Sequence, residues 1–345
     1  MSNPPESVPP EFSASAQIMD MSFTALVTYR AVYAAAKLGI PDLLQGQPRS
    51  SNEIAETTGM HPGAIYRLLR TLSSAGIVSE LPEHRFAVTP LGSGLRSDVP
   101  GSLRAWVILT GEAFYLQVWQ EILYSIRTGK PAWDKVHGMA AFDYFRQHPE
   151  AGRIFDEGMT SLSRERAQAV VSAFDFSRFR TVVDVGGGHG MLLTTILRAH
   201  SQLHGILFDQ PQVVEGARSH IASEGLTLRC DTVGGDFFQT APPGGDAYIL
   251  KSIIHDWDDE HSVAILKNCR QAMTKEARML LVETVVPSTG EPHYAKYNDL
   301  EMLVVLGSQE RTVEEYATLF NRAQFELVGV VATQGPLSIV EAVPV

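Results

Sequence analysis

Cysteine is scarce in this chain of 345 residues, which contains only Cys230 and Cys269. Two cysteines so far apart form neither a disulfide framework nor a CxxC metal motif, and they fit a reduced cytoplasm. Apolar runs of about 18 residues, as needed to cross a bilayer, are also missing. Residues 1–15 are rich in Pro, Ser and Glu and lack the basic start and apolar run of a signal peptide. We therefore expect a disordered leader and a cytoplasmic protein.

Positive charge is in short supply as well. Lys and Arg number 28 against 39 Asp and Glu, which leaves a formal net charge of −11. This balance argues against nucleic acid and anionic membranes as partners, because both would be repelled. The length favours two folding units, and 44% hydrophobic residues are ample for their cores.

The N-terminal region, residues 16–99, predicts a dimerisation domain. Apolar residues recur at helical spacing over 16–44, as in Ile18, Met21 and Leu26, and indicate two helices that are apolar on more than one face. A second copy of the chain is the simplest partner for such helices. Residues 50–88 then follow the order helix, turn, helix and β wing, with Ser51 or Asn52 as the first cap, which is typical of a winged helix.

A winged helix raises the alternative of DNA binding. Between residues 49 and 98, five arginines are balanced by five acidic residues, and lysine is absent. A net charge of zero provides no electrostatic footprint for phosphates. We therefore expect a winged helix that serves dimerisation.

Residues 100–174 predict a helical segment with many large side chains. Most of these should be core, but Pro131 and Gly138 suggest a loop over 130–139. Such a loop would place Trp133 or His137 at the rim of a substrate pocket.

Residues 175–345 predict an α/β domain with a Rossmann-like sheet. Short β-branched runs alternate with helical patterns from residue 179 onward, which indicates a mostly parallel sheet with helices on both faces. The end of the chain, 325–343, reads as a hairpin, so at least one strand should be antiparallel. The expected strands are 181–185, 205–209, 227–233, 247–250 and 279–285, and the expected helices are 192–199, 213–223, 263–273 and 312–323.

A glycine-rich turn follows the first of these strands. Gly186, Gly188 and Gly190 form G-x-G-x-G, and neither frame gives the G-x-G-x-x-G spacing of a dinucleotide site. The pattern resembles the glycine signature of S-adenosylmethionine methyltransferases. Asp209 at the end of the next strand is placed to accept hydrogen bonds from ribose hydroxyls. Asp236 could accept one from an adenine amino group, with Phe237 packed on the ring.

The stretch Leu250–Asp259, LKSIIHDWDD, resembles one family closely: the dimeric small-molecule O-methyltransferases. These include plant caffeic acid and flavonoid enzymes and bacterial enzymes that act on polyketides, phenazines and carotenoids. The resemblance covers nearly the whole chain and implies S-adenosylmethionine as cofactor, S-adenosylhomocysteine as product, no metal, and a homodimer. It implies catalytic roles for His255, Glu283 and Glu310. It adds cofactor contacts from Gly186, Gly188, Asp209, Asp236, Phe237, Lys251 and Ser163, and substrate contacts from Met159, Asp256, Phe155 and Trp133.

The chemistry of methyl transfer explains these residue types. Holding donor and acceptor in line can supply roughly 7–11 kcal/mol of the barrier. A phenol with a pKa near 10 costs about 4 kcal/mol to ionise at neutral pH, and a positioned histidine base contributes about 10²–10⁴-fold. A carboxylate beside the imidazole fixes its tautomer. We therefore expect His255 to pair with Glu310, with Glu283 on the opposite side of the ring.

Three other functions are compatible with parts of the sequence. A member of the same fold could bind the cofactor as a scaffold, a winged-helix regulator could sense the cofactor, and a dehydrogenase could use the same sheet. The intact set of His255, Glu283 and Glu310 argues against the first, the balanced charge against the second, and the glycine spacing against the third. The sequence leaves the identity of the methyl acceptor open.

Overall fold

The computed structural model describes residues 13–345, apart from the side chains of residues 164 and 165. Most of the predicted leader, 1–15, lies outside the described residues. The chain divides into two compact units, with the boundary between Glu112 and Ala113. The sequence predicted a boundary after residue 99, but helix α7 (Arg104–Gly111) belongs to the N-terminal unit.

The N-terminal unit contains the predicted winged helix. Helices α4 (Ser51–Thr58) and α5 (Pro62–Ser74) are followed by strands β2 (Val78–Leu81) and β3 (Arg85–Val88). Strand β1 (Arg49–Ser50) completes a small antiparallel sheet in the order β1-β3-β2. The cap of α4 is Ser50, which forms a capping box with Glu53, so the predicted caps Ser51 and Asn52 were wrong by one and two positions.

The N-terminal helices of this unit leave large apolar side chains exposed. Ile18, Met21, Phe23 and Leu26 are each more than half exposed. The chain here forms one nearly continuous helical stretch that includes a π turn. The remaining helical elements of the unit are α1 (Ala14–Met19), η1 (Asp20–Thr24), α2 (Ala25–Lys37), α3 (Ile40–Leu43), η2 (Pro82–His84) and α6 (Pro90–Ser93).

The C-terminal unit begins with helices and continues as an α/β domain. The predicted loop over 130–139 was wrong, since helix α10 (Ala132–His137) forms there. Its helical elements are α8 (Ala113–Gln120), α9 (Ile122–Thr128), α10, α11 (Ala141–Gln147), α12 (Pro149–Ala173), η3 (Phe176–Arg178), α13 (Met191–Ala199), α14 (Pro211–Ser223), η4 (Ile254–Asp256), α15 (Asp259–Ala272), α16 (Tyr294–Val305) and α17 (Val313–Arg322).

The sheet of this unit has seven strands in the order β6-β5-β4-β7-β8-β10-β9. Its strands are β4 (Thr181–Val185), β5 (His204–Asp209), β6 (Cys230–Gly234), β7 (Ala247–Lys251), β8 (Arg278–Glu283), β9 (Phe325–Ala332) and β10 (Ser338–Pro344). Strands β4 to β8 pair in parallel, and β10 is antiparallel to both of its neighbours. The predicted Rossmann-like sheet and final hairpin are confirmed.

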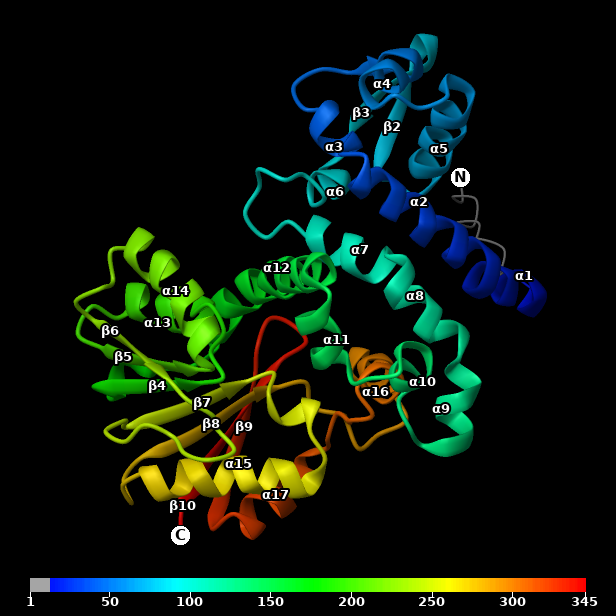
Figure 1. Ribbon diagram of the computed structural model, residues 1–345. Coiled ribbons are helices and arrows are strands. Elements are labelled where there is room, and N and C mark those ends of the chain that lie inside the picture. Colours follow the sequence, from blue (N-terminus) through cyan, green and yellow to red (C-terminus); the bar gives the residue numbers. More distant parts are fainter. Residues whose placement is uncertain (1–12) are drawn as a thin grey trace, which may run out of the picture. The chain divides into compact units, whose positions relative to one another are not determined.

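Alternating side chains of the central strands build one core on each face of the sheet. Along β8, Leu280 and Val282 join one cluster with α12, α13 and α14, while Met279 and Leu281 join the other with α15 and α17. Figure 1 shows α13 and α14 on one side of the sheet and α15 and α17 on the other. Because both faces are covered, the carboxyl edge of the parallel strands is the place where loops can form a site. Among the described residues, no helix is both long and apolar enough to span a bilayer.

Candidate active site

The glycine turn after β4 adopts a backbone that favours glycine. Gly186, Gly188 and Gly190 have φ angles of 70°, 57° and 80°. The carboxylate of Asp209 closes this turn, since one of its oxygens accepts the Gly188 amide at 2.8 Å and the other accepts the Gln210 amide at 2.7 Å. Burial raises the pKa of Asp209. The glycine turn and Asp209, the residue predicted to bind ribose, therefore lie together at adjacent strand ends.

A buried acid that we did not assign to the site lies under the turn. Asp184 precedes the glycines by two residues and is almost fully buried. Burial raises its pKa to about 7. A Cβ atom on Gly187 would lie 2.7 Å from the Asp184 Cγ and 2.4 Å from the Leu207 Cδ1, so only glycine fits there.

Two of the predicted cofactor residues meet across the site. Lys251, at the end of β7, donates a hydrogen bond to the Ser163 hydroxyl of α12 at 3.2 Å. Burial lowers the pKa of the Lys251 ammonium group, and the neighbouring Asp184 carboxylate partly opposes this shift. This contact links the helical segment to the carboxyl edge of the sheet, and the role of both residues in cofactor binding stays a prediction.

Asp236 and Phe237 follow β6, which ends at Gly234. The Asp236 carboxylate accepts the Phe238 amide at 2.9 Å and the Gln239 side-chain amide at 3.1 Å, so it forms a turn of its own. Phe237 packs edge-to-face against Phe238 and Trp257, with ring centroids 4.9 and 6.2 Å away. An aromatic wall is present at the predicted position, and the contact to adenine stays a prediction.

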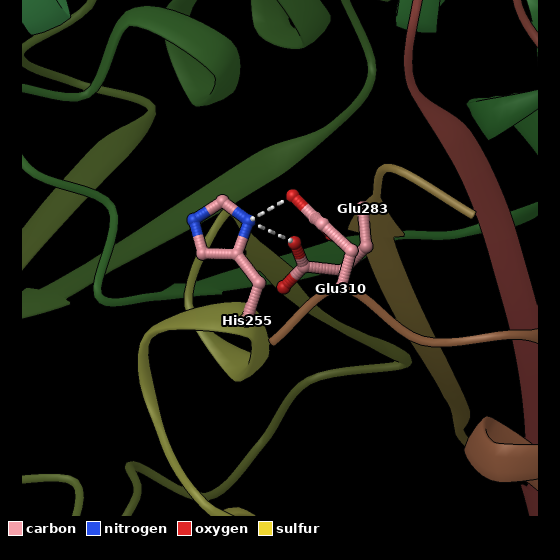
Figure 2. A group of neighbouring side chains, drawn as sticks. All are labelled: His255, Glu283 and Glu310. Atoms are coloured by element: carbon pink, nitrogen blue, oxygen red, sulfur yellow. Dashed lines mark ion pairs between the residues drawn. The ribbon is translucent and has the colours of Figure 1, made fainter. Parts of the chain in front are cut away.

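The three predicted catalytic residues form one cluster. Nδ1 of His255 lies 3.2 Å from Oε2 of Glu283 and 3.2 Å from Oε1 of Glu310, while both glutamate side chains are fully buried. Figure 2 shows both carboxylates directed at the same ring nitrogen. The other nitrogen, Nε2, lies 3.2 Å from the Asp256 carboxylate. The prediction that Glu283 lies opposite Glu310 was wrong.

Backbone pairing explains why the two glutamates share one side. Val286 donates its amide hydrogen to the Arg311 carbonyl at 2.9 Å, so the segments after Glu283 and around Glu310 run together. The turn that carries His255 lies against them: the Ile253 and Ile254 amides donate to Oε1 of Glu283 at 3.0 and 2.8 Å.

The start of this turn has unusual backbone geometry. Ser252 follows β7 with a φ of 55°, which a non-glycine residue rarely adopts. This residue separates the strand from the two amides that bind Glu283. Such backbone strain persists where the surrounding structure enforces it, often at functional sites.

Helix α16 fixes the position of Glu310. The Asn298 side-chain amide donates to Oε1 of Glu310, and the Asp299 carboxylate accepts the Glu310 backbone amide at 2.9 Å. Neither residue was predicted, because their nearness depends on how α16 packs and not on a local pattern. Burial raises the pKa of Asp299.

The ionisation of the cluster follows from burial and proximity. Burial raises the pKa of Glu283 to about 7, although the His255 ring pulls it down. Burial alone would lower the pKa of His255, but the carboxylates of Glu283 and Asp256 outweigh it and hold that pKa well above the ordinary value. The groups titrate together, so protons belong to the cluster as a whole. Burial and the mutual attraction of these groups therefore favour keeping a proton within the cluster.

The same three residues also present the donor set of a metal site. Donor atoms of His255, Glu283 and Glu310 all lie within 4.8 Å of one another. Imidazole and carboxylate are common metal ligands. The prediction that the protein uses no metal therefore stays a prediction.

The residues predicted to bind the substrate have different surroundings. Phe155 of α12 is stacked on Phe145 with ring centroids 4.4 Å apart, and Met159 lies one turn further along the same helix. Asp256 lies beside Nε2 of His255. Trp133 is fully buried and packs against His137 at 4.6 Å, so it has the surroundings of a core residue. The assignment of these four side chains to a pocket stays a prediction.

Comparison with known proteins agrees with both units of the structure. The model of the O-methyltransferase domain matches residues 119–326, and that of the O-methyltransferase dimerisation domain matches residues 21–98. A phenazine O-methyltransferase, PhzM, of Lysobacter antibioticus is 46% identical over 316 residues, which are 92% of this chain and 92% of that protein.

Solved structures agree in fold over nearly the full length. The crystal structure of LaPhzM has a TM-score of 0.91 at 44% identity and covers 97% of this chain and 100% of its own. CalO1, a methyltransferase of calicheamicin biosynthesis solved with bound SAH, has a TM-score of 0.86 at 34% identity, with 97% and 100% covered. This chain therefore belongs to the S-adenosylmethionine-dependent O-methyltransferases that carry an N-terminal dimerisation domain.

Proposed function

We propose that this enzyme transfers the methyl group of S-adenosylmethionine to a hydroxyl group of a small aromatic metabolite, with His255 as the general base. The observation that supports this most strongly is the placement of His255 against two fully buried glutamates. The cluster lies at the same edge of the sheet as the glycine turn, where ligands of parallel α/β sheets bind.

The residues at this edge fit the proposed cofactor. The glycine turn permits close approach of a ligand to backbone amides, and Asp209 lies at the adjacent strand end. Phe237 and the pair of Lys251 and Ser163 border the same edge. When bound, S-adenosylmethionine supplies a methyl group already activated on a sulfonium, so the chain itself needs to position the acceptor and remove its proton.

Proton removal falls to Nε2 of His255. Nδ1 faces both glutamates, which fix the tautomer and stabilise the imidazolium that forms. Asp256, 3.2 Å from Nε2, borders the position that an acceptor hydroxyl would take. Removing the proton during attack avoids the cost of about 4 kcal/mol for ionising a free phenol at neutral pH.

The proposed acceptor is a flat aromatic molecule. Helices α11 and α12 supply the stacked pair of Phe145 and Phe155, and an aromatic surface favours ring stacking. The relative at 46% identity is named for a phenazine, a flat tricyclic ring system.

The proposed assembly is a homodimer formed through the N-terminal helices. Exposed Ile18, Met21, Phe23 and Leu26 form an apolar stretch unusual for a surface that faces water. The match to the dimerisation domain covers three of these residues. Burying them against a second copy removes that surface from water.

The proposed role of His255 as base can be tested with acceptor phenols of different acidity. The variant His255→Ala should lose most turnover on an acceptor phenol whose pKa is near 10, about 10²–10⁴-fold, while binding S-adenosylmethionine as the wild type does in calorimetry. On a nitro-substituted phenol that is already ionised at the assay pH, the same variant should lose far less. Similar losses on both acceptors, or near-normal turnover on the first, would reject His255 as the base.

A further inference from the structure

Arg311 follows Glu310 directly, and its side chain is fully buried. Nη1 donates a hydrogen bond to the Ile254 carbonyl at 2.9 Å, and Nη2 donates one to the Trp257 carbonyl at 2.8 Å. These carbonyls lie on either side of His255 in the chain. The guanidinium group therefore spans the short helix η4 that carries the base.

The remaining contacts of Arg311 join two further segments. Its Nε and Nη2 donate to Oδ1 of Asp259, the first residue of α15, at 3.1 and 2.9 Å. Its backbone carbonyl accepts the Val286 amide at 2.9 Å, just beyond Glu283. One residue thus connects the turn of the base with both segments that supply its glutamates.

The geometry of the guanidinium group suits this role. Its donors point in fixed directions within one plane, so the positions of the acceptors relative to one another are set by the group. A lysine would keep the charge but could not reach the same carbonyls as a rigid fork. The two distances of 3.2 Å from Nδ1 of His255 depend on this alignment of η4 with the other segments.

We propose that Arg311 is a positioning residue of the methyl-transfer reaction, which holds η4 so that the His255 ring stays against Glu283 and Glu310. This inference rests on the proposed role of His255 as base. Arg311 does not touch the reacting atoms in this proposal; it acts through the imidazole.

The test compares Arg311→Lys with a matched control, Arg229→Lys. Arg229 also donates to backbone carbonyls, those of Leu197, His200 and Leu203, but it lies before β6 at the opposite edge of the sheet. Both substitutions remove a guanidinium group that donates hydrogen bonds to backbone carbonyls. Only the first should change the reaction.

For Arg311→Lys we expect kcat on an un-ionised phenol to fall about 10- to 100-fold, the scale of an ångström-sized misplacement. The affinity for S-adenosylmethionine should stay the same. The pH midpoint of kcat should move to lower pH, because an imidazole less well aligned with its carboxylates holds its proton less strongly. Arg229→Lys should lower the unfolding temperature and leave the pH profile unchanged.

Two outcomes would overturn the inference. One is a wild-type kcat and pH profile for Arg311→Lys. The other is a pH profile that moves equally in Arg229→Lys, which would indicate a general loss of stability. If Arg311→Lys fails to fold, Asp259→Asn, a change at a half-exposed position, replaces it in the test. Asp259→Asn should shift the pH profile of kcat in the same direction but by less. An unshifted profile would refute the proposal. His255→Ala, measured alongside, separates the role of Arg311 from the proposed role of His255. Near-normal turnover of His255→Ala would reject His255 as the base.

Discussion

Glu283→Gln separates the catalytic role of this buried carboxylate from its effect on stability. The amide oxygen can still accept the Ile253 and Ile254 amides, so the turn around His255 keeps its two backbone hydrogen bonds. The ion pair with Nδ1 of His255, at 3.2 Å, is lost. Because one of the two carboxylates that face the imidazolium is then neutral, kcat on an un-ionised phenol should fall about 10- to 100-fold, which corresponds to about 1.4–2.7 kcal/mol.

The stability of Glu283→Gln relative to the wild type should rise with pH. Burial raises the pKa of Glu283 from an ordinary value of 4.5 to about 7. A carboxyl group with a raised pKa stabilises the fold below its unfolded pKa, and that contribution is lost as pH rises through about 7. At 1.36 kcal/mol per pH unit, the loss in the wild type reaches at most roughly 3 kcal/mol. Glutamine does not titrate and avoids this loss.

Thermal unfolding at about pH 5 and about pH 8.5 measures this effect. The unfolding temperature of Glu283→Gln relative to wild type should rise between these values by several degrees, on the order of 2–4 °C per kcal/mol for a domain of this size. The exposed Glu276→Gln provides the control and should show no such trend. A difference between Glu283→Gln and wild type that stays constant with pH would refute the reasoning.

Three further predictions test other parts of the account. With an un-ionised phenol, kcat of the wild type should rise with pH and have its midpoint above the ordinary histidine value of 6.5, because carboxylates raise the pKa of His255; a midpoint below 6.5 contradicts this. Asp209→Ala should weaken S-adenosylmethionine binding about 10- to 100-fold in calorimetry, since it removes both the predicted ribose acceptor and the 2.8 Å hydrogen bond to Gly188; unchanged affinity rejects the contact. Leu26→Glu, at a side chain that is 59% exposed, should shift the protein toward monomer in sedimentation velocity, whereas Leu228→Glu, at 95% exposure, should not; a dimer unaffected by the first change would place the interface elsewhere.

The sheet and its helices were largely predictable because their patterns are local. Alternation in β8 and the helical period of α17, with its Thr312 and Glu315 capping box, require no knowledge of distant residues. The cap of α4 was also available in the sequence. Ser50 lies three residues before Glu53, the spacing of a capping box, and this spacing decides among three adjacent residues that can cap a helix.

The wrong prediction of a loop over residues 130–139 came from a pattern of proline and glycine that has two structural interpretations. Pro131 and Gly138 were interpreted as signs of a loop. In the structure Pro131 is the N-cap of α10, and Gly138, with a φ of 73°, ends that helix. Proline before and glycine after a short run mark the two ends of a helix as well as the interior of a loop.

The site was predictable only in part, because its geometry depends on tertiary contacts. The motif around His255 and the two later glutamates pointed to residues that the structure brings into one cluster. The side of the ring on which Glu283 lies depends on the pairing of Val286 with Arg311, which no local pattern reveals. The same is true of Asn298 and Asp299, which reach Glu310 from a different helix.

The most direct test of the central claim is a crystal structure with S-adenosylhomocysteine and an un-ionised phenol acceptor. The account predicts the sulfur beside the glycine turn at Gly186–Gly190, with the acceptor hydroxyl between that sulfur and Nε2 of His255. An acceptor hydroxyl bound by another side chain, with Nε2 still held by Asp256, would contradict it.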